Sequence, residues 1–166
     1  MTKKVDPIPK GYHTITPYLI VKGAAKALDF YKKAFGAKVI TRCDCPETGM
    51  LMHAELKIGD SMFMLSDECP GKEGKGTASP KTLKGVCVCL HLYVKNVDTS
   101  FNKAVKSGAK VTMPVADMFW GDRYGQIEDP FGHRWSLSTH KEDLSKKEIE
   151  KRAKEFFSSK KKKAKK

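Results

Sequence analysis

Apolar residues recur along residues 11–140 with two periods, one typical of strands and one typical of helices. In the first half, strand-like runs are expected at 14–21, 39–42, 52–58 and 61–67. Helical spacing predicts a helix over 23–35 that ends at Gly36. After a linker at 68–85 that is rich in Gly and Pro, the order returns as a strand at 86–94, a helix at 97–107, a strand at 111–115 and a hairpin within 122–140.

The repeat is also visible in the residues themselves. Gly36–Val39 has the same four residues as Gly108–Val111, and at the same offset Phe63 meets Trp135. One such unit cannot bury its sheet face alone. We therefore expect an α+β fold, in which two βαβββ modules form a curved, mixed and mainly antiparallel sheet around a cleft. The predicted boundaries are a leader arm at 1–10, modules at about 11–67 and 86–140 within a domain at 11–140, and a helix with a basic tail at 141–166.

These motifs resemble the vicinal oxygen chelate superfamily, which includes glyoxalase I, extradiol dioxygenases and bleomycin-resistance proteins. The similarity rests on Leu28–Tyr31 in the first helix, with Gly36 after it, and on the turn Glu128–Gly132. A closer resemblance to the PhnB-like branch is carried by the runs 16–19, 53–56, 120–125 and 129–135. The resemblance implies a homodimer, because clefts in this superfamily often form across subunits. In metal-dependent members of the superfamily, the first and the last strand of each module each supply one ligand to a divalent ion.

Strand periodicity predicts which side chains face the cleft. A turn at Gly59–Asp60 would pair Leu56 with Phe63 in the core and Glu55 with Met64 on the inner face. The aliphatic positions Val86, Val88, Leu90, Leu92 and Val94 should pack under the helices. The inward side chains are then expected to be Thr14, Thr16, Tyr18, Ile20, His53, Glu55, Met62, Met64, Ser66, Cys87, Cys89, His91, Tyr93, Arg123, Gly125, Ile127, Arg134, Ser136 and Ser138.

The metal-ligand positions that the resemblance implies carry unsuitable residues. They are Thr16, Met64, Cys89 and Ser136, and none is His, Asp or Glu. Such a set is a poor site for hard or borderline metals. A relocated zinc or iron site from His53, Glu55 and His91 is an alternative, although these side chains could equally bond each other or line a solvated groove.

Arg123 is the candidate for binding an anion, because a guanidinium beside glycines can clamp a carboxylate or phosphate. The alternative is that Arg123 forms an ion pair with Asp117, Asp122 or Glu128. His133 lies in the predicted turn and is expected to be exposed. Trp120 is expected to pack in the core.

Composition and charge narrow the classes of function and the cellular location that the sequence allows. The net charge is +13, of which the twelve Lys or Arg and five Asp or Glu of residues 141–166 contribute +7. An apolar stripe predicts a docked helix at 146–157, followed by a disordered tail at Lys160–Lys166 that could contact nucleic acid or other polyanions without sequence preference. The chain shows no secretory signal or membrane span, and its five cysteines do not suggest a disulfide framework. A cytoplasmic protein with reduced thiols is therefore expected.

Two functions follow from these residues. The first is a protein that binds a small polar or anionic molecule in the cleft without a cofactor, through Tyr18, His53, Glu55, Cys89, His91, Arg123 and Ser136. The second is a metal-dependent lyase, isomerase or dioxygenase acting on a substrate with two oxygen donors. In the second, Zn, Fe, Ni or Mn would act as a Lewis acid, and Glu55 would be a ligand or the general base.

Overall fold

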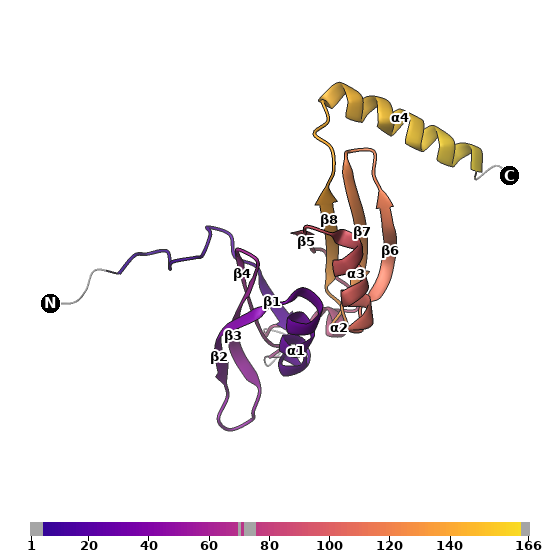
Figure 1. Ribbon diagram of the computed structural model, residues 1–166. Helices are drawn as coiled ribbons and strands as arrows, with labels where there is room; N and C mark the ends of the chain where they lie inside the picture. The colour runs from indigo at the N-terminus through magenta and orange to yellow at the C-terminus, as the bar shows by residue number, and fades with distance from the viewer. Residues whose placement is uncertain (1–4, 70, 72–75, 164–166) are drawn as a thin grey trace.

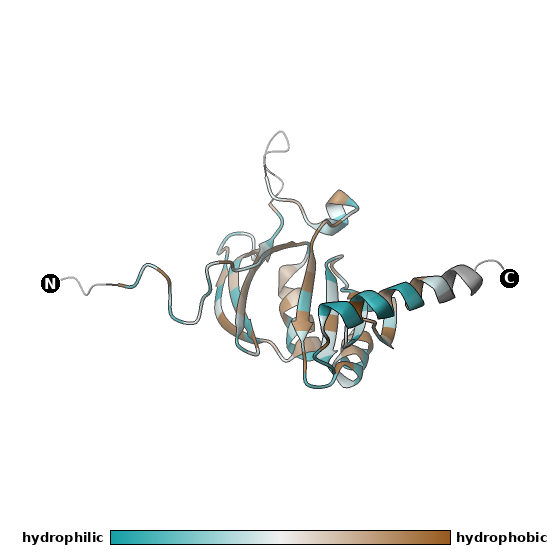
Figure 2. Cartoon of the chain, turned by 90° about the horizontal axis from the view of Figure 1, so that it is seen from above, coloured by the Kyte–Doolittle hydropathy of each residue, from teal (hydrophilic) through white to brown (hydrophobic). Residues whose placement is uncertain are grey.

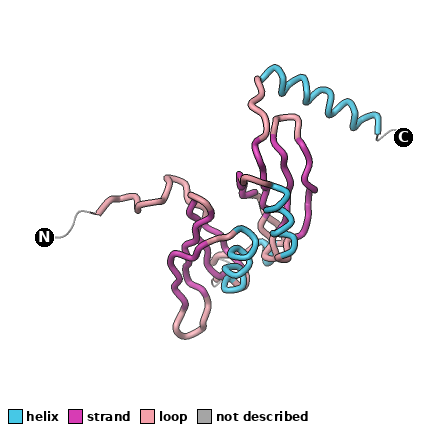
Figure 3. Tube along the Cα trace, in the orientation of Figure 1, coloured by secondary structure: helices cyan, strands magenta, loops and turns pink. Residues whose placement is uncertain are grey.

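The computed structural model describes residues 5–69, 71 and 76–163 and confirms an α+β fold with two βαβββ modules (Figures 1 and 3). The first module consists of β1 (Tyr18–Val21), α1 (Ala24–Phe35), β2 (Lys38–Asp44), β3 (Leu51–Ile58) and β4 (Ser61–Asp67). The second consists of β5 (Cys89–Tyr93), α3 (Val97–Lys106), β6 (Lys110–Asp117), β7 (Asp122–Glu128) and β8 (Arg134–His140). A short helix α2 (Pro80–Leu83) lies in the linker, and α4 (Lys146–Lys163) follows the second module.

Each module forms its own four-stranded sheet, and the two sheets have the same topology. The strand orders are β1-β4-β3-β2 and β5-β8-β7-β6. In each sheet the first strand pairs in parallel with the last, and the other pairs are antiparallel. The predicted register of the first hairpin is confirmed, since Leu56 pairs with Phe63 and Glu55 with Met64. The sequence repeat therefore reflects a structural repeat.

The helices α1 and α3 contact each other between the two sheets (Figure 1). The aromatic core joins the modules here, because the Tyr31 ring of α1 lies 5.5 Å from both Phe63 of its own module and Trp135 of the other. Phe35 also packs on Trp135, with ring centroids 4.8 Å apart. Each sheet thus has one face covered by helices. We call the opposite face of each sheet its open face.

A buried carboxylate holds this junction together. Asp129 Oδ2 accepts hydrogen bonds from the Tyr31 hydroxyl at 2.7 Å and from Trp135 Nε1 at 2.9 Å. Its Oδ1 accepts from the backbone amides of Phe131 and His133, both at 2.9 Å. Burial, reinforced by the neighbouring Asp129, raises the pKa of Tyr31 well above its usual value, so the phenol stays protonated as a donor.

The predicted facing of β7 is wrong for Arg123, Gly125 and Ile127. Residues directly opposite in an antiparallel pair share a face, and the register places Ile127 opposite Trp135 and Gly125 opposite Leu137. Ile127 is fully buried, and a Cβ on Gly125 would lie 2.8 Å from a ring atom of Phe101 in α3. These residues therefore face the helices.

The predicted limits of the first strand of each module also need correction. Strand β1 begins at Tyr18 rather than at residue 14, because Pro17 has no amide hydrogen to donate and contributes only its carbonyl oxygen, to the amide of Met64. In β5, Leu90 and Leu92 pack against the core as expected. Val88 precedes the strand and is 60% exposed, so the prediction that it packs under the helices is wrong.

His133 is buried rather than exposed, and its Nε2 lies 3.1 Å from the carbonyl oxygen of Ile20 in the first module. The predicted turn at Asp129–Gly132 is present, and only the exposure of His133 was wrong, because this turn packs inward against the first module. The linker also carries more structure than predicted. Ser79 is fully buried and caps α2 by accepting from the amide of Thr82.

The C-terminal helix α4 extends to Lys163, beyond the predicted end at residue 157. The prediction of a disordered tail is therefore wrong for residues 160–163, and residues 164–166 lie outside the described part. The ring of Phe119 packs on Phe156 and Phe157 of α4, while Arg152 pairs with Glu142 at 2.9 Å. The side of α4 shown in Figure 2 is largely hydrophilic. No helix in the described ranges combines the length and apolar character needed to cross a membrane.

We expect Asp129→Asn to lower the free energy of unfolding by about 2–4 kcal/mol, because the amide nitrogen cannot accept the bonds that one carboxylate oxygen now accepts. Urea unfolding followed by circular dichroism measures this change. The matched control is Asp29→Asn, whose carboxylate is exposed and forms a 3.7 Å ion pair with Lys32. We expect that control to change stability by less than about 0.5 kcal/mol. Equal effects of the two substitutions would contradict the central role of Asp129.

Candidate functional site

A network of polar side chains lies on the open face of the first sheet. The Tyr18 hydroxyl lies 3.2 Å from His53 Nδ1, and His53 Nε2 lies 3.6 Å from Glu55 Oε1. The other carboxylate oxygen of Glu55 accepts a 2.8 Å hydrogen bond from the Thr41 hydroxyl. This bond is the main cause that lowers the pKa of Glu55, so its carboxylate is ionised at neutral pH. The structure thus brings together three predicted site residues, Tyr18, His53 and Glu55.

Side chains of the N-terminal arm, residues 5–17, and of this open face together line a cavity of about 480 Å³. Its lining residues are Pro7, Ile8, Pro9, Tyr12, His13, Thr14, Thr16, Glu55 and Met64. The Tyr12 hydroxyl is shielded from solvent and lies beside the Glu55 carboxylate, with which it interacts. Burial, followed by the neighbouring Glu55 carboxylate, raises the pKa of Tyr12 to about 12. Tyr12 therefore offers an uncharged donor to this cavity.

Sequence reasoning missed Tyr12 because it follows the polar, proline-containing leader and lies outside any periodic strand. Its signal was slight: a large aromatic residue next to Gly11, in a segment that otherwise lacks aromatic residues. What gives the hydroxyl its role is the way the arm folds back on β3 and β4. That contact between distant segments has no local pattern.

A second polar cluster lies on the open face of the second sheet. Ser136 of β8 is buried, and its Oγ lies 2.7 Å from His91 Nδ1 and 3.5 Å from Cys89 Sγ. Burial lowers the pKa of His91, which favours the neutral imidazole. The His91 ring packs edge-on against Tyr93 at 4.6 Å and stacks on Tyr124 at 6.0 Å. Three more predicted site residues therefore meet here.

The two clusters belong to different modules, and the predicted relocated metal ligands are divided between them. His53 and Glu55 lie in the first cluster, whereas His91 lies in the second. Within residues 5–69, 71 and 76–163, no three or more His, Cys, Asp or Glu side chains are placed to hold a metal ion.

The donors at the positions implied by the family also do not fit such an ion. Thr16 and Met64 line the arm cavity of the first module, and Cys89 meets Ser136 in the second. Two hydroxyls, a thioether and a thiol suit neither magnesium-like nor zinc-like ions, which prefer carboxylate and imidazole ligands.

Arg123, the predicted anion clamp, is paired with carboxylates and faces the helix side of its sheet. Its guanidinium forms two hydrogen bonds with the Asp98 carboxylate of α3, at 2.7 and 2.8 Å, and one with Asp117 at 3.1 Å. These bonds raise the pKa of Arg123 above its usual value. The alternative of an ion pair with Asp117 is confirmed, and Asp98 is the additional partner.

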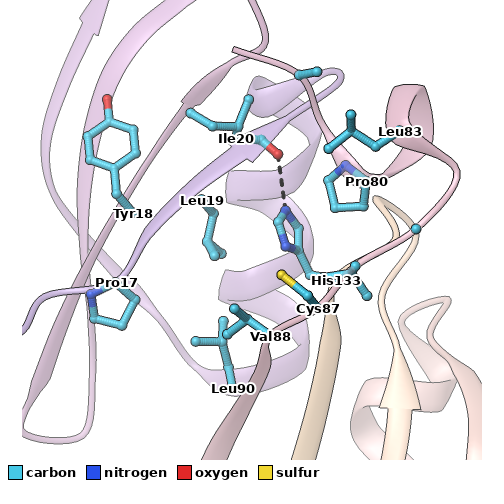
Figure 4. A pocket seen from close by; sticks show the side chains of 13 residues that line it. Pro17, Tyr18, Leu19, Ile20, Pro80, Leu83, Cys87, Val88, Leu90 and His133 are labelled. Atoms are coloured by element: carbon cyan, nitrogen blue, oxygen red, sulfur yellow. Dashed lines mark hydrogen bonds between the residues drawn. The ribbon is translucent and has the colours of Figure 1, made fainter.

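A cavity of about 700 Å³ lies between the modules (Figure 4). It opens between β1 and the segment that runs from α2 to β5, and its lining includes Leu19, Pro80, Leu83, Val88, Leu90 and His133. A smaller cavity of about 300 Å³ lies near the other end of the gap between the modules and is lined by residues that include Cys89 and His91. The walls of the larger cavity are mainly apolar.

Comparisons with known proteins agree with this architecture. The chain is 42% identical over 136 residues to the uncharacterized protein Mb0911c of Mycobacterium bovis, covering 82% of this chain and 89% of that protein. The solved structure of TioX from Micromonospora sp. ML1 matches 77% of this chain and 98% of its own, with a TM-score of 0.60 and 24% identity. A PhnB protein from Bacillus cereus matches 76% and 99%, with a TM-score of 0.59 and 21% identity.

The two solved structures show that the fold is shared with a PhnB protein and with TioX. A family model with the description Glyoxalase/Bleomycin resistance protein/Dioxygenase superfamily matches residues 11–137. That range begins just before Tyr12 and includes both polar clusters. The chain belongs to the Glyoxalase/Bleomycin resistance protein/Dioxygenase superfamily.

Proposed function

We propose that this protein binds a small organic molecule in the arm cavity of the first module and needs no resident metal ion to do so. The observation that carries the proposal is the pairing of a solvent-shielded Tyr12 hydroxyl with the ionised Glu55 carboxylate in the wall of this cavity. A ligand that carries both a donor and an acceptor can hydrogen-bond to this pair.

The cavity also limits the chemistry of the ligand. Its volume of about 480 Å³ lies within the range of roughly 300–1,000 Å³ found for ligand sites. Glu55 is the acidic residue in its lining, and no Lys or Arg lines it among the described residues. A neutral or cationic ligand therefore fits better than an anion. Such a ligand would accept from Tyr12, donate to Glu55 and place its apolar part against Ile8 and Met64.

Binding should depend on Tyr12 and Glu55. Thermal-shift screening of neutral and cationic organic molecules identifies ligands, and calorimetry then gives Kd for each variant. We expect Tyr12→Phe and Glu55→Gln each to weaken binding by about tenfold, as expected for the loss of one hydrogen bond in a buried site. The control is Tyr93→Phe, which removes a hydroxyl that bonds to Asp122 at 3.5 Å in the other module and does not line the arm cavity. Ligands whose Kd is unchanged in Tyr12→Phe would contradict the proposal.

The absence of a metal requirement is tested separately. Elemental analysis of protein purified without an affinity tag or added metal should give far less than one divalent ion per chain. EDTA should leave both Tm and the Kd of the identified ligands unchanged, because a bound ion would stabilise the folded state. Stoichiometric zinc, iron, nickel or manganese, with EDTA abolishing ligand binding, would instead support the metal-dependent alternative.

We also propose that the protein forms a homodimer through the rim of the large cavity between the modules. Leu83 and Val88 on this rim are 66% and 60% exposed, and Tyr18 nearby is 45% exposed. Contiguous exposed apolar side chains of this kind are typical of interfaces. The strands β1 and β5 each pair on one side only, so both also present a free edge here.

Light scattering coupled to size exclusion should therefore give twice the chain mass of 18.6 kDa. We expect Val88→Asp to shift the mass to that of a monomer, because burying an unpaired carboxylate in an interface is costly. The control Ile40→Asp changes a side chain of β2 that is 54% exposed and lies away from this rim, and it should remain dimeric. A monomeric wild type would refute the dimer.

A further inference from the structure

Three side chains form a line of polar atoms across the open face of the second module. The Cys89 thiol donates to Ser136 Oγ at 3.5 Å, and Ser136 Oγ lies 2.7 Å from His91 Nδ1. Cys89 is exposed, whereas Ser136 is 3% exposed. The serine hydroxyl therefore stands between an accessible thiol and an imidazole, within hydrogen-bond distance of both.

The direction of the hydrogen bonds can be assigned from the chemistry of the groups. Burial lowers the pKa of His91, so the imidazole is neutral at pH 7 and can take up a proton. In the tautomer with the proton on Nε2, Nδ1 accepts the Ser136 hydroxyl proton, and the Ser136 oxygen accepts the thiol proton of Cys89. A nucleophile in hydrogen-bonded connection with a neutral base is the arrangement that activates cysteine in enzymes.

The smaller cavity between the modules lies along β5, the strand that carries Cys89 and His91. Its volume is about 300 Å³, and Cys89 and His91 line it together with Ile15, Met62 and Phe63. No Lys, Arg, Asp or Glu of the described residues lines it. Such a cavity favours a small neutral molecule, because a charged one would lose its hydration without gaining a charged partner.

We propose that Cys89 adds covalently to small neutral α,β-unsaturated carbonyl compounds, with Ser136 relaying the thiol proton to His91. The Cys89 proton moves to the Ser136 oxygen as the Ser136 proton moves to His91 Nδ1. The thiolate then forms a C–S bond with the β-carbon, and the π electrons of the C=C bond move toward the carbonyl oxygen to give an enolate. His91 returns its proton through Ser136 to the α-carbon, so the product contains every atom of both reactants and no oxidant is needed.

This site is distinct from the arm cavity and does not depend on the function proposed for it. Two other cysteines of the chain serve as reference thiols in the test. Cys87 is exposed and lies two residues from Cys89, just before β5. Cys45 is a reactive thiol of a different kind, because hydrogen bonds from Thr48 and the amide of Glu47 lower its pKa.

The test is alkylation by 2-cyclohexen-1-one at pH 7, followed by peptide mass spectrometry that gives a rate for each of the five cysteines. We expect Cys89 to react at least about tenfold faster than Cys87, because a hydrogen-bonded base takes up the thiol proton as the C–S bond forms. His91→Gln and Ser136→Ala should each reduce the rate at Cys89 to that of Cys87. Both variants should leave the rate at Cys45 unchanged, since Thr48 is untouched.

Circular dichroism and Tm show whether each variant is folded. Ser136 is buried, so Ser136→Ala could unfold the protein, and the result for His91→Gln then decides the test. Iodoacetamide, a neutral probe that reacts by displacement of iodide, separates activation of the thiol from recognition of the carbonyl compound. Faster reaction at Cys89 with both probes, lost in His91→Gln, supports the relay. Equal rates at Cys89 and Cys87 in the wild type, or a fast Cys89 that survives His91→Gln, would overturn it.

Discussion

The carboxylate of Asp129 connects parts of the chain that are almost 100 residues apart. It accepts from Tyr31 of the first module and from Trp135 of the second, and two backbone amides of its own turn complete its hydrogen bonds. A buried charge is tolerated only when its oxygens are satisfied in this way. The turn, the aromatic core and the placement of α1 against the second sheet therefore depend on one another.

Local pattern predicted much of this fold. Alternation of apolar and polar residues located the strands, and a two-residue turn at Gly59–Asp60 fixed the register of the first hairpin. The same reasoning failed for β7, where Arg123 and Gly125 gave no apolar signal and Ile127 was assigned to the wrong face. The face of that strand is set by its pairing with Trp135 and Leu137, which alternation within β7 does not reveal.

In the candidate sites, too, the sequence predicted some groupings of residues and missed others. Residues that share a strand or a strand pair, such as His53 with Glu55 or His91 with Ser136, could be grouped from periodicity and the repeat. Contacts between separate elements could not be predicted. Arg123 of β7 forms hydrogen bonds with Asp98 of helix α3. Tyr12 of the N-terminal arm contacts Glu55 of β3, and no pattern within either segment predicts that contact. Both contacts affect the sites, since the first pairs the Arg123 cation with a carboxylate and the second places the Tyr12 hydroxyl beside Glu55.

The aromatic core has a consequence for the order of events during synthesis. Tyr31 and Phe35 of α1 bury their rings against Trp135, which leaves the ribosome about 100 residues later. Until that residue emerges, Phe63 of the same module contacts Tyr31, but the part of α1 that packs on Trp135 is uncovered. Contacts over such sequence distances form slowly. The first module is thus complete in its strands but incomplete in its core. A duplicated fold of this kind does not reduce to two independent halves, and a chain stopped after the first repeat would be prone to aggregate.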